Sequence, residues 1–179
     1  MVKLFKKEKI LFIFLFIIMG IFCDIFFAGE KTIDNDVISA SLSANYIALI
    51  LNNLYILYMF FKTKKVKGLY DKIICRIGQK KFFNSYITNS LIDILLYMFI
   101  TYSIIYLKLG INLNYIVVFI IFLALSFCNF LFQELISNLT FFTRKGSQYI
   151  IYPIMMNLLF HYYIVPLLVS IFSNQLGGI

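Results

Sequence analysis

The chain has 179 residues, of which 62% are hydrophobic and 13% are charged, and its mean hydropathy is +0.91. A soluble domain of this length has too small an interior to bury so much apolar surface, so the composition excludes a soluble globular protein. The net charge of +8 raises nucleic acid as a partner, but the charges lie at the ends of apolar runs, which is typical of membrane topology. We therefore expect an integral protein of a lipid bilayer that binds no nucleic acid.

Five apolar runs are long enough to cross a bilayer. A hydrocarbon core of ~30 Å requires about 20 residues of helix. The predicted spans are residues 10–28, 37–61, 86–107, 115–137 and 148–172. The predicted fold is all-α, a polytopic transmembrane helix bundle of about five spans that forms a single domain over residues 1–179.

The first and last runs need separate arguments. No small-x-small cleavage pattern follows the first run, so we expect an uncleaved span rather than a signal peptide. In the last run, Pro153 and Pro166 each lack a backbone donor. This segment is therefore expected to be kinked or re-entrant.

A basic stretch over residues 62–84 joins the second and third spans. It holds eight of the sixteen Lys and Arg residues and a single acid, Asp71. Its apolar residues recur at spacings of three and four, which predicts an amphipathic helix over residues 66–78 with Gly78 as its C-terminal cap. Such a helix either lies on the membrane surface or docks on a cytosolic partner.

The distribution of basic residues predicts the orientation of the chain. Fourteen of the sixteen Lys and Arg residues lie before the first span, in the basic stretch or in the loop 138–147. Only Lys31 and Lys108 lie on the other side. The positive-inside rule then predicts a multi-pass cell-membrane protein with a cytoplasmic N-terminus, a cytoplasmic amphipathic helix and an extracellular C-terminus.

Polar residues within the spans gather at one predicted depth. At 1.5 Å per residue, Asn52, Asp93, Asn129 and Asn157 all lie roughly 10–14 Å from the cytoplasmic edge. This polar layer either holds the helices together by hydrogen bonds, each worth about 1 kcal/mol or less, or lines a pathway or a contact with a second subunit. No Lys or Arg is expected within the spans, so Asp93 has no evident basic partner there.

Two ionisable groups are predicted in the outer half of the membrane. Asp24 and His161 both come out at a depth of ~20 Å, so a hydrogen-bonded pair is one hypothesis. The alternative is that Asp24 faces the outer headgroups while His161 is a neutral packed imidazole.

The chain lacks the motifs that carry catalysis or hold a cofactor. It has no P-loop, no HExxH, no GxSxG and no pair of carboxylates at catalytic spacing on one helix. Cys23, Cys75 and Cys128 are widely spaced and include no CxxC, so neither a disulfide framework nor a metal site is expected. We predict that the protein is not an enzyme by itself and has no catalytic residues, no cofactor and no metal.

The basic stretch resembles one feature of a known family. Residues 70–83, YDKIICRIGQKKFF, follow the "apolar–Arg–x–Gly–polar–basic–basic–aromatic" run of the coupling helix in permease subunits of type-2 ABC transporters. The family normally has six spans with both termini inside, whereas five are predicted here. The resemblance covers residues 1–172 in layout but only this stretch in motif, as in a short or divergent member.

The resemblance implies a function and a set of partners. It implies a dimer with a second membrane subunit, bound to cytosolic ATPase subunits that hydrolyse ATP, and export of an amphipathic cargo such as a peptide, lipid or drug. The coupling residues that it implies are Tyr70, Ile73, Ile74, Arg76, Ile77, Lys80 and Lys81.

Two other function classes fit the same size and number of spans. One is the small substrate-binding membrane component of a vitamin-type uptake system, which would bind its ligand near Asp24 and His161. The other is a stand-alone immunity or scaffold membrane protein, which would act without ATP.

Overall fold

The computed structural model describes residues 46–109, 116–142 and 149–172, together with seven residues between Ile10 and Ile21. Every element in these ranges is helical. In chain order the elements are η1 (Tyr46–Leu51), α3 (Asn52–Ile77), α4 (Gln79–Leu109), α5 (Ile116–Asn138), η3 (Leu139–Phe142), α6 (Ile151–Leu159), η5 (Phe160–Ile164) and α7 (Val165–Phe172).

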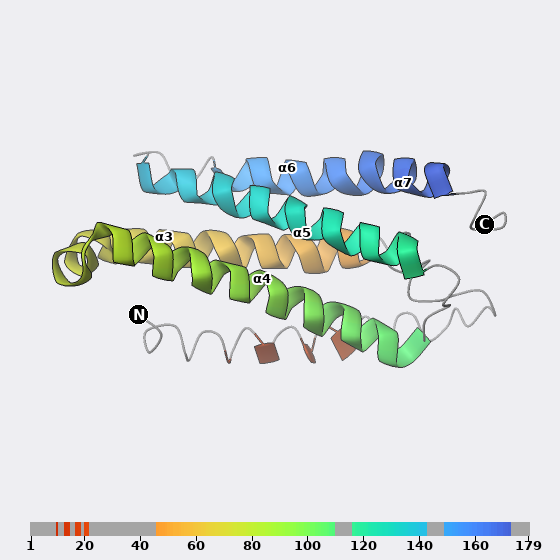
Figure 1. Cartoon of the computed structure of the whole chain (residues 1–179), viewed down its shortest axis with the longest axis horizontal. Helices are drawn as coiled ribbons and strands as arrows, with labels where there is room; N and C mark the ends of the chain where they lie inside the picture. Colours follow the sequence, from red (N-terminus) through yellow and green to blue (C-terminus); the bar gives the residue numbers. More distant parts are fainter. Residues whose placement is uncertain are drawn as a thin grey trace.

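The long helices lie lengthwise beside one another (Figure 1). Helix α3 packs against α4, α5 and α6, and α5 packs against α4 and α6. Three helical segments are long and apolar enough to cross a membrane: Gln79–Ile104, Ile116–Phe141 and Ile151–Ile171. The predicted helical bundle is thus confirmed for the described residues. Most of the first predicted span and the first part of the second lie outside the described residues, so the number of five spans stays a prediction.

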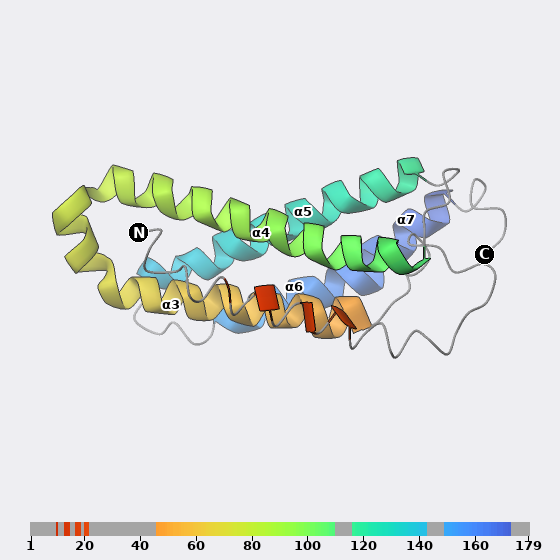
Figure 2. The same cartoon turned by 90° about the horizontal axis from the view of Figure 1, so that it is seen from below.

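The basic stretch is built differently from the prediction. Helix α3 runs without a break from the second predicted span to Ile77, so the amphipathic helix expected over residues 66–78 is the C-terminal part of α3 and not a separate element. The reason is local, because seven of the fifteen residues between Phe61 and Ile77 are Lys, Leu or Arg, which are good helix formers, and the segment includes no proline. Figure 2 shows the yellow-green end of α3 turning across the end of the bundle before α4 runs back beside it.

Gly78 forms the turn between α3 and α4, as the sequence predicts. Its φ of 78° and ψ of 154° lie in a region that only glycine adopts readily. Its N–H donates to the carbonyl of Ile74 at 2.9 Å, and its own carbonyl accepts from the N–H of Phe82 at 3.1 Å. One residue therefore ends α3 and begins α4, and α4 starts at Gln79 rather than at Tyr86.

The last helical column is continuous from α6 through η5 to α7 (Figure 1). Pro153 falls in the first turn of α6, where a missing N–H removes no helical hydrogen bond. Before Pro166 the helix widens into the π-helical turn η5, in which the N–H of Val165 donates to the carbonyl of Phe160. The widened turn accommodates the proline, and residues 151–171 form one continuous helical segment that is long and apolar enough to cross a membrane.

Three aromatic side chains form the centre of the bundle. The rings of Tyr55 on α3 and Tyr97 on α4 stack at a centroid distance of 4.4 Å and an interplanar angle of 7°. Phe130 of α5 packs edge-on against both rings at 5.3 Å. All three are buried, and each aromatic pair adds about 0.5–1.5 kcal/mol beyond the burial of its area. This stack fixes α3, α4 and α5 relative to one another.

The two glycines of the basic stretch are expected to respond oppositely to alanine. Gly78→Ala forces a side chain into a glycine-only conformation and should lower the free energy of unfolding by about 1–3 kcal/mol. Gly68 lies inside α3 with nothing within 4 Å of an added Cβ, so Gly68→Ala should raise it by about 0.5–1 kcal/mol. Unfolding of the purified protein in detergent measures both. Equal effects of the two substitutions would contradict the described turn.

Candidate functional site

A buried ion pair joins α3 to α4. The Nζ atom of Lys62 lies 2.8 Å from Oδ2 of Asp93, and the two residues are 6% and 2% exposed. Lys62 also donates to Ser90 Oγ at 3.0 Å, and the hydroxyl of Tyr58 donates to Asp93 Oδ2 at 3.3 Å. The Lys62 ammonium further lies 5.3 Å from the centroid of the Tyr86 ring. The charge of Lys62 is thus held by a carboxylate, a hydroxyl and an aromatic face.

This pair corrects two expectations from the sequence. The sequence predicted that Asp93 has no basic partner and that the spans contain no Lys or Arg. In the structure Lys62 is the basic partner of Asp93, and it is buried among the packed helices. The prediction placed Lys62 at the start of a cytosolic segment because the apolar run ends at Phe61. Since α3 continues through that point, its buried face continues too. Tyr55, Met59, Lys62 and Val66 follow one another at spacings of four, three and four, and this spacing was the available signal.

A second hydrogen-bonded group lies beside the pair and adds α5. Oγ1 of Thr63 donates to the carbonyl of Met59 at 2.9 Å and lies 2.7 Å from the hydroxyl of Tyr86. The Tyr86 hydroxyl in turn lies 3.4 Å from Oε1 of Glu134. Glu134 is only 5% exposed. We define the charged core as Lys62, Asp93 and Glu134, one residue from each of α3, α4 and α5.

A third polar group joins η1 and the start of α3 to α6. Nδ2 of Asn157 donates to the carbonyl of Ala48 at 2.7 Å and to Oδ1 of Asn53 at 3.0 Å. Nδ2 of Asn52 donates to Oδ1 of Asn157 at 3.3 Å, and the hydroxyl of Tyr97 donates to Oδ1 of Asn52. Asn157 is fully buried, so these bonds satisfy an amide that would otherwise be costly inside the bundle.

The predicted polar layer therefore separates into different groups. Asn52 and Asn157 are bonded to each other, Asp93 pairs with Lys62, and Asn129 is buried with an Nδ2 atom that has no partner in the described structure. The depth of a residue along a helix does not say which neighbour its side chain faces. That depends on the rotation of the helix, which the estimate from the span ends did not include.

Helix α5 and the η3 turn after it carry a row of buried polar side chains, of which the prediction singled out only Asn129. Asn129, Gln133, Ser137 and Thr140 follow at spacings of four, four and three, and none is more than 7% exposed. Among the described residues, both polar atoms of Gln133 lack a hydrogen-bond partner, as do Ser137 Oγ, Thr140 Oγ1 and Glu134 Oε2. Buried polar atoms without a hydrogen-bond partner are uncommon in proteins, so this row is a candidate place for a bound ion or water molecule.

The predicted coupling residues fall into two groups at the α3–α4 turn. Tyr70, Ile73 and Ile74 pack on a cluster formed by the buried side chains of Val66, Phe82 and Tyr86. These side chains hold the two helix ends together and are only partly accessible. The remaining predicted residues, Arg76, Ile77, Lys80 and Lys81, are exposed. We call residues 76–81 the tip.

The tip surrounds a shallow hollow. The hollow is lined by Ile77, Gly78, Gln79, Lys80, Lys81 and Asn84. This lining holds two ammonium groups and no carboxylate. Below the tip, Nζ of Lys67 donates to the carbonyl of Thr140, so the base of the hairpin is fastened to η3. The exposed surface at this end of the bundle is therefore cationic, and the cluster that contains Phe82 and Tyr86 packs beneath it.

His161 lies in η5 and is 9% exposed. It lines a void of about 10 Å³ together with Asn52 and Ser126, which is room for about one water molecule. Its predicted partner Asp24 lies outside the described residues. The pair of Asp24 and His161 stays a prediction.

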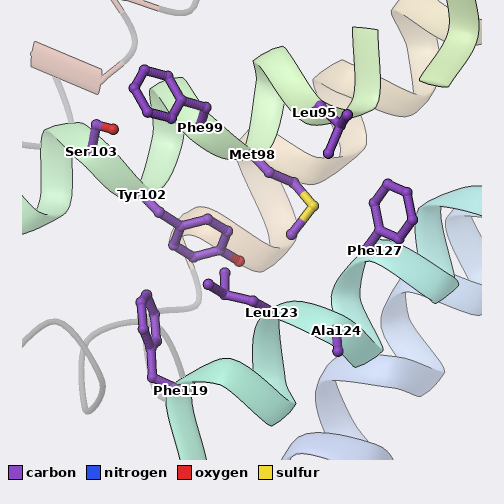
Figure 3. Close-up of a pocket in the computed structure, with 9 residues that line it drawn as sticks. All are labelled: Leu95, Met98, Phe99, Tyr102, Ser103, Phe119, Leu123, Ala124 and Phe127. Atoms are coloured by element: carbon purple, nitrogen blue, oxygen red, sulfur yellow. The ribbon is translucent and has the colours of Figure 1, made fainter. Parts of the chain in front are cut away.

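An apolar groove of about 570 Å³ runs between α4 and α5. Figure 3 shows Met98 and Tyr102 of α4 facing Leu123 of α5 across it. Leu95 and Phe99 at its edge are 55% and 72% exposed. No charged residue lines the groove, so it suits an apolar occupant such as a lipid acyl chain and offers no group to bind a charged ligand.

Comparison of the chain with protein-family models, with curated proteins and with solved structures finds no match. The resemblance of residues 70–83 to a coupling helix therefore stays a prediction. Among the described residues, no group of three His, Cys, Asp or Glu side chains is placed to hold a metal ion. The functional argument depends on the charged core and the tip.

Breaking the ion pair from one side is expected to be costly. Lys62→Met leaves Asp93 buried without its cation, and Asp93→Asn leaves Lys62 without its anion, so each should destabilise by about 3–5 kcal/mol. The double variant Lys62→Met/Asp93→Asn removes both charges and should cost clearly less than the two single effects combined. Unfolding in mixed detergent micelles measures the cycle.

Lys64→Met is the matched control for this cycle, because Lys64 is exposed on the same helix and has the same side chain as Lys62. We expect it to change the free energy of unfolding by less than about 0.5 kcal/mol. If Lys62→Met were no more destabilising than Lys64→Met, the buried pair would be refuted.

Proposed function

We propose that this chain is the membrane subunit of an ABC-type exporter and that its tip docks on a separate cytosolic ATPase. The observation that carries the proposal is the division of residues at the α3–α4 turn. Apolar side chains of the basic stretch are used to pack the turn, while Arg76, Lys80 and Lys81 remain exposed around Ile77. A surface of this kind supports recognition of an acidic protein face with an apolar contact at its centre.

The alternative of a helix lying on the membrane surface is less well supported. A surface helix needs its apolar face available to insert among the lipids. Here Tyr70, Ile73 and Ile74 contact Val66, Phe82 and Phe83 instead, so most of that face is already used within the chain. This packing favours a protein partner over lipid.

The mechanism that we propose is mechanical coupling through α3. The tip and the charged core lie on the same uninterrupted helix, with Ile77 fifteen residues, or about 22 Å, beyond Lys62. Movement of the tip by a nucleotide-driven partner would therefore shift Lys62 and Asp93, which the hairpin carries together, relative to Glu134 on α5. A second membrane subunit and an amphipathic cargo, namely a peptide, lipid or drug, belong to the same proposal.

Site-specific crosslinking tests the partner. In a background with Cys23, Cys75 and Cys128 changed to Ser, Ile77→Cys carrying a photoreactive label should capture a protein that azido-ATP also labels. Arg76→Glu together with Lys80→Glu should lower that capture at least tenfold, because each reversal turns an attraction into a repulsion. The matched control Lys64→Glu lies about three helical turns away and should leave the capture unchanged.

Capture of lipid alone, or of a protein that does not bind ATP, would contradict the proposed ATPase partner. The uptake-component alternative would instead show a copurifying small ligand that raises the melting temperature. The scaffold alternative would show function that survives depletion of ATP.

Labelling of single cysteines tests the orientation on which the proposal depends. Lys80→Cys should react with a membrane-impermeant maleimide only after cells are permeabilised, because the positive-inside rule places the tip in the cytosol. Ser173→Cys should react in intact cells, as expected for an extracellular C-terminus. Reaction of Lys80→Cys in intact cells would place the tip outside, where no cytosolic ATPase can reach it.

A further inference from the structure

The charged core contains one more carboxyl group than cationic groups. Among the described residues, the buried charged side chains are Lys62, Asp93 and Glu134, with His161 in a separate part of the bundle. The ammonium of Lys62 is already bonded to Asp93 and Ser90. With all three groups ionised, the core would carry one uncompensated negative charge, which a low-dielectric interior does not tolerate.

The groups that face Glu134 do not supply this missing charge. From α3 it interacts with Lys62, from α4 with Tyr86, Ser90 and Asp93, and Tyr55 of α3 lies close enough to interact with it as well. Lys62 is the one cation among them, and its direct partner is Asp93. Oε2 of Glu134 has no hydrogen-bond partner in the described structure.

The hydrogen-bonded chain from Glu134 to Met59 also lacks one proton. It contains three contacts: Glu134 to Tyr86, Tyr86 to Thr63, and Thr63 to the carbonyl of Met59. Each hydroxyl has one proton to donate, so the two hydroxyls supply only two of the three. A proton on Glu134 would complete the chain. A metal ion bound to the Glu134 carboxylate would also neutralise its charge. It would supply no proton to the chain, so the 3.4 Å contact between Glu134 and Tyr86 would stay weak.

Further oxygen atoms without partners in the described structure lie on α5 and on the η3 turn that follows it. Gln133 Oε1 and Ser137 Oγ are within one turn of Glu134 along α5, and Thr140 Oγ1 follows toward the end of the bundle at which the tip lies. Gln133 and Ser137 are fully buried. Neutral oxygen atoms beside a single carboxylate are the ligands that suit a small hard cation or the water that carries a proton.

We propose that the charged core is a binding site for one monovalent cation, a proton or an alkali-metal ion, held at Glu134 and approached along the polar row of α5 and η3. One positive charge neutralises the core. A divalent ion would instead leave the core with one excess positive charge, because Lys62, Asp93 and Glu134 together carry a single net negative charge. The site does not depend on the identity of the partner at the tip. A movement of α3 relative to α5 would change the surroundings of Glu134 and would therefore be coupled to binding or release of the cation.

Infrared spectroscopy of the purified full-length protein in nanodiscs tests the proton. A protonated carboxyl group has a carbonyl band that an ionised carboxylate lacks. At neutral pH the wild type should show this band, isotopic labelling of Glu should shift it, and Glu134→Gln should remove it. The matched control Asp71→Asn removes an exposed carboxyl group from α3 and should leave the band unchanged.

Thermal unfolding in NaCl, KCl or choline chloride at equal ionic strength tests the alkali-metal ion. If such an ion is bound, the wild type and Asp71→Asn should show a saturable upward shift of the melting temperature in NaCl or KCl. Glu134→Gln should lose that shift. If Glu134→Gln does not fold, the isotope shift of the band and the salt dependence of the wild type still decide the question.

A carbonyl band identifies the proton as the bound cation, and a cation-specific shift identifies the alkali-metal ion. Absence of both in the wild type would overturn the proposal. A band or a shift that persists in Glu134→Gln would overturn it as well.

Discussion

The ion pair between Lys62 and Asp93 is the interaction on which the arrangement of α3, α4 and α5 depends. Both side chains are buried, so neither charge can be satisfied by water if the other moves away. Moving one helix relative to the other would expose an uncompensated charge to an apolar interior, which costs several kcal/mol. The aromatic stack of Tyr55, Tyr97 and Phe130 fills the adjoining space, so that packing and charge fix the same register.

Because α3 is a single helix, this register extends to the tip. Gly78 reverses the chain without a loop, the cluster of Val66, Phe82 and Tyr86 holds the two helix ends together, and Lys67 fastens them to η3. The α3–α4 hairpin is therefore held together as one unit. Lys62 lies where the hairpin packs within the bundle, and Arg76, Lys80 and Lys81 lie at its exposed turn. In the proposed function, a partner bound at the tip would act on the charged core through α3.

Sequence patterns predicted the parts of this fold that depend on local physics. Apolar runs predicted the helices, and Gly78 was recognised as a helix end because only glycine fits that turn. The partner of Asp93 was missed because the end of an apolar run was taken as the end of a buried face. Lys62 follows Phe61 in sequence, yet it lies on the same side of α3 as Tyr55 and Met59. The polar row of α5 was visible as a spacing, but whether Gln133 and Glu134 have hydrogen-bond partners depends on neighbours that no single-helix pattern contains.

The central claim is that the ion pair holds α3 and α4 together as one hairpin, so that the tip keeps one position relative to α5. Spin labels at Lys72→Cys near the tip and at Leu135→Cys on α5, both exposed positions, report that position as a distance distribution in a background without the native cysteines. We predict a single narrow distribution for the wild-type core and for the Lys64→Met control, and a broadened or displaced one for Asp93→Asn. An Asp93→Asn distribution identical to that of the wild-type core would contradict the claim.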